Sequence, residues 1–205
     1  MTQPQQRGGT GGASPDALGS VPGLSYVEEI IPVEEETRLL AAIDDGAWLA
    51  VLKRRVQHHG YRYDYRSRKV EREMYLGPLP VWAQEITRKL ESLQVMTQSP
   101  DQLIVNEYLP GQGIAPHIDC IPCFGATVAV LSLGSTCLME FSQPETGEHA
   151  ALLLSPRSLL VLTDEARYRW RHAIRGRQSD AWQGVRYPRS RRVSLTFRSV
   201  LLPSP

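Results

Sequence analysis

The sequence contains little of what marks a secreted or membrane protein. Its 205 residues include only three cysteines, too few to suggest a disulfide framework, so a cytoplasmic location is expected. No apolar run approaches the roughly 20 residues that a membrane helix needs, so no membrane association is expected. Residues 1–20 have five glycines and two prolines but no apolar core, which predicts a disordered tail rather than a signal peptide. We expect residues 21–205 to form one domain of a monomeric protein.

The net charge is also small, at +1, but the charges are unevenly distributed along the chain. Residues 25–48 have seven acids against one base, and residues 53–72 have eight bases against two acids. Residues 166–198 carry ten arginines against a single aspartate. Basic stretches of this kind favour a polyanionic partner such as nucleic acid, although a solvated charged face would give the same pattern. Charge alone leaves both interpretations open.

Two helices are expected in the first half of the chain and a series of strands in the second. Residues 33–43 place acids in a first helical turn and an apolar stripe behind them. From Pro80 to about Leu93, apolar residues recur every four positions. From residue 101 onward, short apolar or alternating runs, including YRWRHAI at 168–174, are separated by Gly, Pro, Ser or Asp. This order predicts a mainly β (α+β) fold, with helices packed on one side of a β-sandwich or barrel.

Tyrosines and arginines alternate between the two expected helices. Tyr61, Tyr63 and Tyr65 would share one face of an extended hairpin, with Arg62 and Arg66 among them. Because aromatic rings stack on bases and cations neutralise phosphates, these residues are candidate nucleic-acid contacts. The alternative is an edge strand whose tyrosines cover the core while its charges prevent edge pairing.

A candidate metal site lies in the stretch NEYLPGQGIAPHID, residues 106–119. His117 and Asp119 alternate onto the same face of a strand, and a second histidine would complete a 2-His-1-carboxylate triad. Such a triad binds ferrous iron and leaves positions open for a cosubstrate and oxygen. Among the other histidines, His172 in the strand-like run YRWRHAI is best placed to be the third ligand. An H-x-D pair alone is weak evidence, because such pairs occur by chance.

Four further residues are candidates for binding a dicarboxylate. Arg192 and Arg198 are six residues apart, an even spacing that puts both on one face of a strand. Arginines that face a barrel interior are costly unless they meet anions. A dicarboxylate such as 2-oxoglutarate offers a carboxylate at each end, which guanidinium groups bind through paired hydrogen bonds. Asn106 and Tyr108, again alternate residues, would face the same interior.

Taken in order, five motifs closely resemble those of the AlkB-type Fe(II)/2-oxoglutarate-dependent dioxygenases. They are N-E-Y-x-P-G-x-G-I-x-P-H-x-D, L-S-L-G-S, P-R-S-L-L-V-L, Y-R-W-x-H-x-I and R-V-S-L-T-F-R. The resemblance covers about residues 22–200. It implies a double-stranded β-helix, or jelly roll, with an N-terminal nucleotide-recognition region over its mouth.

The same resemblance implies a reaction and the residues that carry it out. Fe(II), 2-oxoglutarate and O2 would be required, and 2-oxoglutarate would be oxidatively decarboxylated to succinate and carbon dioxide. An alkyl carbon on a nucleobase would be hydroxylated, and an N-methyl group would then be lost as formaldehyde. Arg192 would bind the distal carboxylate, and Arg198 the end near the metal. In full, the implied iron ligands are His117, Asp119 and His172, and the implied 2-oxoglutarate-binding residues are Asn106, Tyr108, Arg192 and Arg198.

The sequence departs from the DNA-repair members of this family at Ile121, where they usually carry another acid. The stretch KRRVQHHGYRYDY, residues 53–65, instead looks most like the subgroup that contains the animal tRNA wobble-uridine hydroxylase. We therefore expect a dioxygenase that demethylates or hydroxylates alkylated bases in DNA or RNA. The alternatives are the same chemistry on a protein side chain or small molecule, and a binding module with an inactive metal site.

Cys120 and Cys123 form a C-x-x-C pair directly after the metal motif. Because there is no second pair, a zinc site is not expected. We expect two small apolar residues that line a loop.

Overall fold

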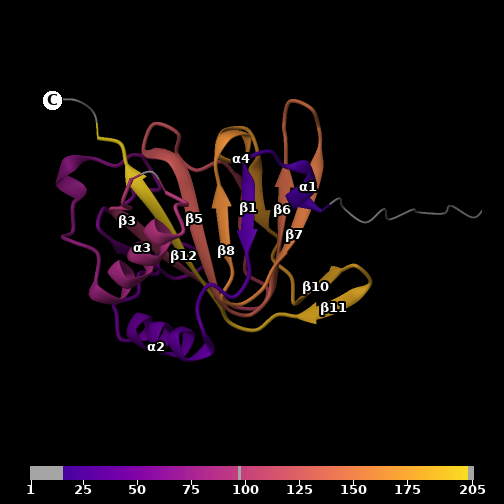
Figure 1. Cartoon of the computed structure of the whole chain (residues 1–205), viewed down its shortest axis with the longest axis horizontal. Helices are drawn as coiled ribbons and strands as arrows, with labels where there is room; N and C mark the ends of the chain where they lie inside the picture. The colour runs from indigo at the N-terminus through magenta and orange to yellow at the C-terminus, as the bar shows by residue number, and fades with distance from the viewer. Residues whose placement is uncertain (1–15, 97, 203–205) are drawn as a thin grey trace, which may run out of the picture.

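Two antiparallel β-sheets form the centre of the protein, which is described by a computed structural model over residues 16–96 and 98–202 (Figure 1). The larger sheet has the strand order β1-β8-β5-β12-β3-β2, and the smaller has the order β4-β9-β6-β7. The larger sheet contains β1 (Leu24–Val27), β2 (Val56–His59), β3 (Gln102–Tyr108), β5 (Phe124–Gly134), β8 (Leu159–Leu162) and β12 (Arg192–Val200). The smaller sheet contains β4 (Ile114–His117), β6 (Cys137–Ser142), β7 (His149–Leu154) and β9 (Arg171–Ile174).

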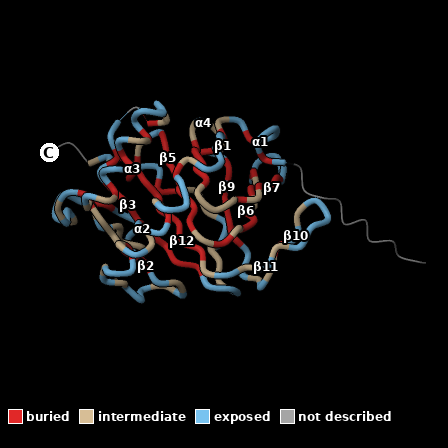
Figure 2. Tube along the Cα trace, turned by 60° about the horizontal axis from the view of Figure 1, so that its bottom comes forward, coloured by how far each residue is buried: buried red, intermediate tan, exposed pale blue. Residues whose placement is uncertain are grey.

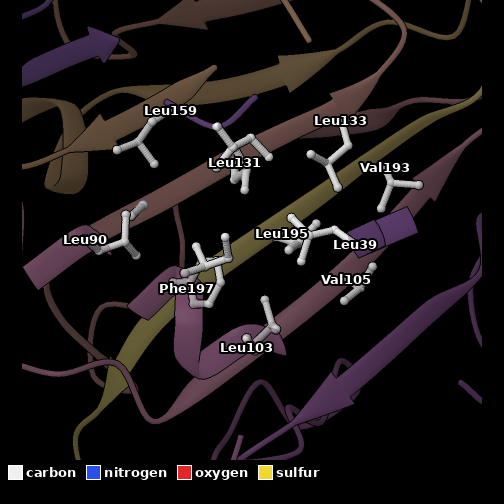
Figure 3. Close-up of a cluster of buried hydrophobic side chains, with 14 of the residues drawn as sticks. Leu39, Leu90, Leu103, Val105, Leu131, Leu133, Leu159, Val193, Leu195 and Phe197 are labelled. Atoms are coloured by element: carbon white, nitrogen blue, oxygen red, sulfur yellow. The ribbon is translucent and has the colours of Figure 1, made fainter. Parts of the chain in front are cut away.

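One face of the larger sheet is covered by helices. Helices α2 (Val33–Asp44) and α3 (Val81–Ser92) lie on the side of this sheet away from β6 and β7 (Figure 1). Side chains alternate across a strand, so every second residue of β3, β5 and β12 points toward these helices. Figure 3 shows the resulting cluster, in which the helices contribute Leu39 and Leu90. Burying each large apolar side chain stabilises the fold by about 1.5–3 kcal/mol.

The opposite face of the larger sheet packs against the smaller sheet. Near β8 the contact is apolar, since Val130 and Leu160 belong to one buried cluster with Met139 and Phe141 of β6. Toward β3 and β12 the side chains become polar, and a cavity of about 770 Å³ lies between the sheets. Figure 2 shows the buried segments concentrated along the strands of both sheets. Two facing antiparallel sheets around a cavity confirm the expected jelly roll.

The two expected helices are confirmed, and the run at 168–174 is corrected. Helix α3 begins at Val81 rather than at Pro80, which is its N-terminal cap. The run YRWRHAI is only partly a strand, because Tyr168 ends helix α4 (Asp164–Tyr168) and β9 begins at Arg171. The amides of Arg169 and Trp170 both donate to the carbonyl of Glu165, which closes a helical turn before the strand starts.

Several short elements were not expected from the sequence. Strands β10 (Ser179–Trp182) and β11 (Val185–Pro188) form a largely exposed hairpin, and a 3₁₀ helix covers Arg72–Met74. Most of the expected disordered tail at residues 1–20 lies outside the described residues. Its last residues contradict that expectation, because Ala17–Ser20 forms helix α1 with Ala17 fully buried. None of the described helices is long and apolar enough to cross a membrane.

Candidate active site

The cavity between the sheets collects side chains from β3, β5, β8 and β12 on one side and from β4, β6 and β9 on the other. Most of the residues singled out in the sequence meet here, although they are spread over more than 130 positions of the chain. Those that line the cavity are Tyr63, Tyr65, Asn106, Tyr108, His117, Asp119, Cys120, His172, Arg192 and Arg198.

Pairing between β4 and β9 brings the candidate metal ligands together. His117 and His172 are directly opposite each other in this antiparallel pair, and their ring centroids are 4.3 Å apart. Asp119 follows β4, and its Oδ2 lies 3.9 Å from Nε2 of His172. Nδ1 of His117 lies 2.8 Å from the carbonyl oxygen of Ala115. A carbonyl only accepts, so Nδ1 of His117 carries a proton in this hydrogen bond, and Nε2 is the ring nitrogen left to serve as a metal ligand.

The protonation states in this group also suit a divalent cation. Burial, and secondly the nearby His117, lower the pKa of His172 to about 3, so its imidazole is neutral at physiological pH. Burial alone would raise the pKa of Asp119, but the positive charge of Arg198 holds it well below its usual value. Two imidazoles and one carboxylate are the donor set of a ferrous 2-His-1-carboxylate site.

The ligand separations are longer than in a formed metal centre. Among the described residues, no three His, Cys, Asp or Glu side chains converge closely enough to hold an ion. Bonds of about 2.1 Å at right angles place two donor atoms about 3 Å apart. The 3.9 Å between Asp119 and His172 is therefore about 1 Å too long. The donor chemistry fits iron, and binding would require the side chains to close by about that amount.

The two arginines of β12 have different partners. Arg198 donates from Nη2 to Oδ1 of Asp119 at 2.7 Å and from Nη1 to Gln102 at 3.0 Å, so it lies at the candidate metal end. Arg192 donates from Nη2 to Oγ of Ser132 at 2.8 Å. Its Nε and Nη1 are buried and have no partner among the described residues. A buried guanidinium with two unused donors is costly unless an anion completes it, so Arg192 fits a carboxylate ligand.

Several cavity residues were missed in the sequence. Ser194 and Thr196 lie between the two arginines on the same face of β12, and the alternation that selected the arginines would have found them. Arg54 precedes β2, where no strand periodicity applies. It donates from Nε to Oδ1 of Asn106 at 2.9 Å and lies 5.5 Å from the ring of Tyr108.

The tyrosine-rich segment only partly meets the expectation. Tyr63 and Tyr65 line the cavity with their rings 5.2 Å apart, and the buried hydroxyl of Tyr65 has no partner among the described residues. Tyr61 instead packs against Tyr75 at 5.0 Å, because the backbone bridge between these two residues fixes it at the base of the segment. The expected contacts Arg62 and Arg66 are exposed and outside the cavity lining, whereas Arg68 lines it.

The C-x-x-C pair differs from its expected role. Cys120 and Cys123 are both buried, but they are joined by a disulfide bond. The tight turn, in which the amides of Cys123 and Phe124 both donate to the carbonyl of Cys120, brings the two Cα atoms to 5.2 Å. This separation is within the range that a disulfide spans.

Half of the ten arginines at residues 166–198 form salt bridges with described residues: Arg175, Arg177, Arg189, Arg191 and Arg198. Arg175 and Arg177 both bind Glu140, and Arg189 forms two hydrogen bonds with the buried carboxylate of Asp180. The pairs with Glu140 tie the segment before β10 to β6, and the Arg189 pair joins β10 to the residue after β11. The arginines of the tyrosine-rich segment, by contrast, form no salt bridge within residues 16–96 and 98–202. Exposed arginines without a salt bridge to a described residue therefore lie both in the tyrosine-rich segment and along residues 166–198, where they are Arg169, Arg171 and Arg186.

Comparison with known proteins agrees with the geometry. The chain is 37% identical over 208 residues to the Arabidopsis thaliana "Alkylated DNA repair protein ALKBH8 homolog". The matched region covers 90% of this chain and 60% of that protein. It is also 37% identical over 203 residues to the Mus musculus "tRNA (carboxymethyluridine(34)-5-O)-methyltransferase ALKBH8", covering 87% of this chain and 30% of the relative. The chain thus spans three-fifths or less of these two proteins.

A solved structure and a family model also match this chain. The solved structure of OsALKBH1 has a TM-score of 0.69 at 17% identity, over 87% of this chain and 97% of that one, which shows a shared fold. The family model described as "2OG-Fe(II) oxygenase superfamily" matches residues 43–198. Enzymes of this family require Fe(II), 2-oxoglutarate and O2. The motif resemblance is confirmed: the chain belongs to the 2OG-Fe(II) oxygenase superfamily, within its AlkB-type branch.

Proposed function

We propose that this protein uses Fe(II) and 2-oxoglutarate to hydroxylate or demethylate bases of a nucleic acid. The observation that carries the proposal is the placement of Arg192. Its buried Nε and Nη1, which have no partner in the part of the chain that the structure describes, face the same cavity as His117, Asp119 and His172. An anion site and a metal-type donor set in one cavity are what 2-oxoglutarate-dependent chemistry needs.

In this proposal His117, Asp119 and His172 hold the iron. When bound, the metal supplies the oxidising chemistry that couples decarboxylation of 2-oxoglutarate to hydroxylation of the substrate. Burial keeps the His172 imidazole neutral, and Arg198 orients the Asp119 carboxylate through the 2.7 Å hydrogen bond to Oδ1. With Oδ1 occupied in this way, Oδ2 is left for the cation.

The cosubstrate would lie along the polar face of β12. Arg192, supported by Ser132, binds the distal carboxylate of 2-oxoglutarate with its two free donors. Asn106 and Tyr108 complete the pocket from β3, and Arg54 holds the Asn106 amide in place. Val130 and Leu160 line the cavity beside these groups and exclude water from the reacting atoms.

Nucleic acid is the proposed substrate because of the segment that borders the cavity. Tyr63 and Tyr65 offer rings on which a base can stack, and the unpaired arginines beside them can neutralise phosphates. The names of the relatives, which refer to alkylated DNA repair and to tRNA carboxymethyluridine, support the same substrate class. A target base inside a duplex would have to be flipped out, at a cost of a few kcal/mol.

The test is a substrate panel supplied with Fe(II) and 2-oxoglutarate. Methylated DNA and RNA oligonucleotides are assayed for formaldehyde release, and RNA carrying modified uridines is assayed by mass for gain of an oxygen atom. We expect turnover with at least one nucleic acid and none with peptides. Succinate formation that is stimulated by peptides or small molecules, but by no oligonucleotide, would favour the alternative substrate class.

A further inference from the structure

Arg167 is a buried arginine whose hydrogen bonds go to main-chain carbonyls. Its side chain is 2% exposed, and it forms no salt bridge with a described carboxylate. It donates from Nη1 to the carbonyl oxygen of Asp119 and from Nε to that of Gly125, both at 3.0 Å. From Nη2 it reaches the carbonyl oxygens of Phe124 at 3.0 Å and Cys120 at 3.3 Å. One guanidinium thus holds four carbonyls, two in the loop between β4 and β5 and two at the start of β5.

The loop needs such a partner because it has little backbone structure of its own. Residues 118–123 connect β4 to β5 and lie outside both sheets. Within the loop, the described backbone hydrogen bonds are those from Cys123 and Phe124 to the carbonyl of Cys120. A buried carbonyl left without a donor costs about 1–3 kcal/mol. Arg167 therefore replaces the strand partner that would otherwise fix the backbone of Asp119.

Arg167 also connects the two segments that supply the candidate ligands. It lies in α4, five residues before His172, and α4 leads directly into β9. The same guanidinium grips the main chain of Asp119. The position of the Asp119 carboxylate relative to the His172 imidazole therefore depends on this side chain.

We propose that Arg167 is a positioning residue for the metal site, fixing the Asp119 backbone against the segment that carries His172. This inference rests on the proposed function, in that it takes Asp119 and His172 as ligands. A buried cation without a carboxylate partner is costly compared with a packed apolar side chain. Burying Arg167 despite this cost is explained if the geometry of the Asp119 loop is needed for metal binding. Residues that orient metal ligands typically contribute 10–100-fold to metal affinity.

The test is the affinity of the metal alone, measured as binding of Mn(II) by electron paramagnetic resonance. Arg167→Met keeps most of the side-chain volume and removes every donor. We expect Mn(II) binding at least tenfold weaker than in the unsubstituted protein, at a temperature where both are folded. The matched control is Arg189→Met, which removes another buried arginine, bound to Asp180 far along the chain from the Asp119 loop. It should leave the Mn(II) affinity within twofold.

The outcomes separate this inference from the proposed function. If the unsubstituted protein fails to bind Mn(II), or binds it equally well after His172→Ala, the metal assignment itself is wrong. If metal binding depends on His172 but Arg167→Met binds within twofold of the unsubstituted protein, the positioning role is wrong. Should Arg167→Met fail to fold, Arg167→Lys serves instead: it keeps the cation but not the planar fork, and at least tenfold weaker Mn(II) binding is again expected. Unchanged affinity in a folded Arg167→Lys protein would overturn the inference.

Discussion

The two faces of β12 are equally buried but chemically opposite. Val193, Leu195 and Phe197 point toward the helices, and each is no more than 1% exposed. Arg192 and Arg198 point toward the cavity and are only 2% and 7% exposed. Burial alone therefore does not distinguish a core from a site. What distinguishes them is whether the buried groups are satisfied by the protein itself.

On the helix-covered side, the charged group of β3 is fully paired. Glu107 lies at the edge of that face and accepts hydrogen bonds from Arg55 and Arg191. On the cavity side, Arg192 keeps two donors without a partner among the described residues. A fold tolerates such unused donors when a ligand supplies the acceptor. We therefore expect the cavity side, the unpaired face, to bind ligands. We expect the helix-covered side, the paired face, to contribute to the stability of the fold.

The largest expected effect is on the cavity side, at the metal. Replacing His172 with Ala removes one of three ligands, so succinate production should fall to background while oligonucleotide affinity barely changes. Succinate is measured with Fe(II) and 2-oxoglutarate in excess. The control is His149→Ala, at an exposed histidine outside the cavity, which should retain activity. Retained turnover in His172→Ala would remove His172 from the triad.

The next effect is on the helix-covered side. Phe197→Ala should lower the free energy of unfolding by about 3–5 kcal/mol, because it leaves a void in the cluster shown in Figure 3. Denaturant titration measures this loss. The folded protein should bind 2-oxoglutarate with unchanged affinity, since Phe197 points away from the cavity. If Phe197→Ala lost cosubstrate affinity but kept its stability, the assignment of this face to the core would be wrong.

A smaller effect is expected at Arg192, where substitution should weaken cosubstrate binding and not lower stability. Arg192→Met removes the donors proposed for the distal carboxylate, which should weaken 2-oxoglutarate binding by about 2–3 kcal/mol, or roughly 30–150-fold. Calorimetric titration of the Mn(II)-loaded protein measures the affinity. Stability without ligand should be unchanged or higher, because the unpaired buried donors are gone. Marked destabilisation with normal binding would make Arg192 a structural residue.

The smallest effect is a pH dependence on the paired face. Burial would raise the pKa of Glu107, but the hydrogen bonds from Arg55 and Arg191 lower it below the ordinary value of 4.5. The pairing therefore stabilises the fold above about pH 4.5 and is lost as the pH falls through the lower, folded-state pKa. Glu107→Gln should cost about 1 kcal/mol near neutrality, because both arginines are partly exposed, and less in acid. Equal destabilisation at pH 7 and pH 3 would contradict this.

Patterns with a fixed period carried most of what the sequence could predict. Alternation placed Arg192 and Arg198 on one face of β12, and the same rule selected Asn106 and Tyr108 on β3. The helices at 33–43 and from Pro80 were predicted because their apolar stripes recur at helical spacing. Each of these features depends only on neighbours within one element.

Features that depend on contacts between distant segments could not be predicted. Nothing near Arg167 indicates that it holds a loop more than 40 residues earlier in the chain. Tyr61 departs from its neighbours because of a bridge to Tyr75. The Cys120–Cys123 disulfide follows from a tight turn that the residue types alone do not specify. The hairpin β10–β11 was missed because its polar strands lack an apolar alternation.

The central claim is that the unpaired face of β12 and the histidines opposite it bind 2-oxoglutarate together with iron. The most direct test is an anaerobic titration of the Fe(II)-loaded protein with 2-oxoglutarate, followed by visible absorption. We predict a saturable metal-to-ligand charge-transfer band that succinate does not produce, that is lost in His172→Ala, and that needs a higher 2-oxoglutarate concentration in Arg192→Met. Absence of the band in the unsubstituted protein, or its persistence in His172→Ala, would contradict the account.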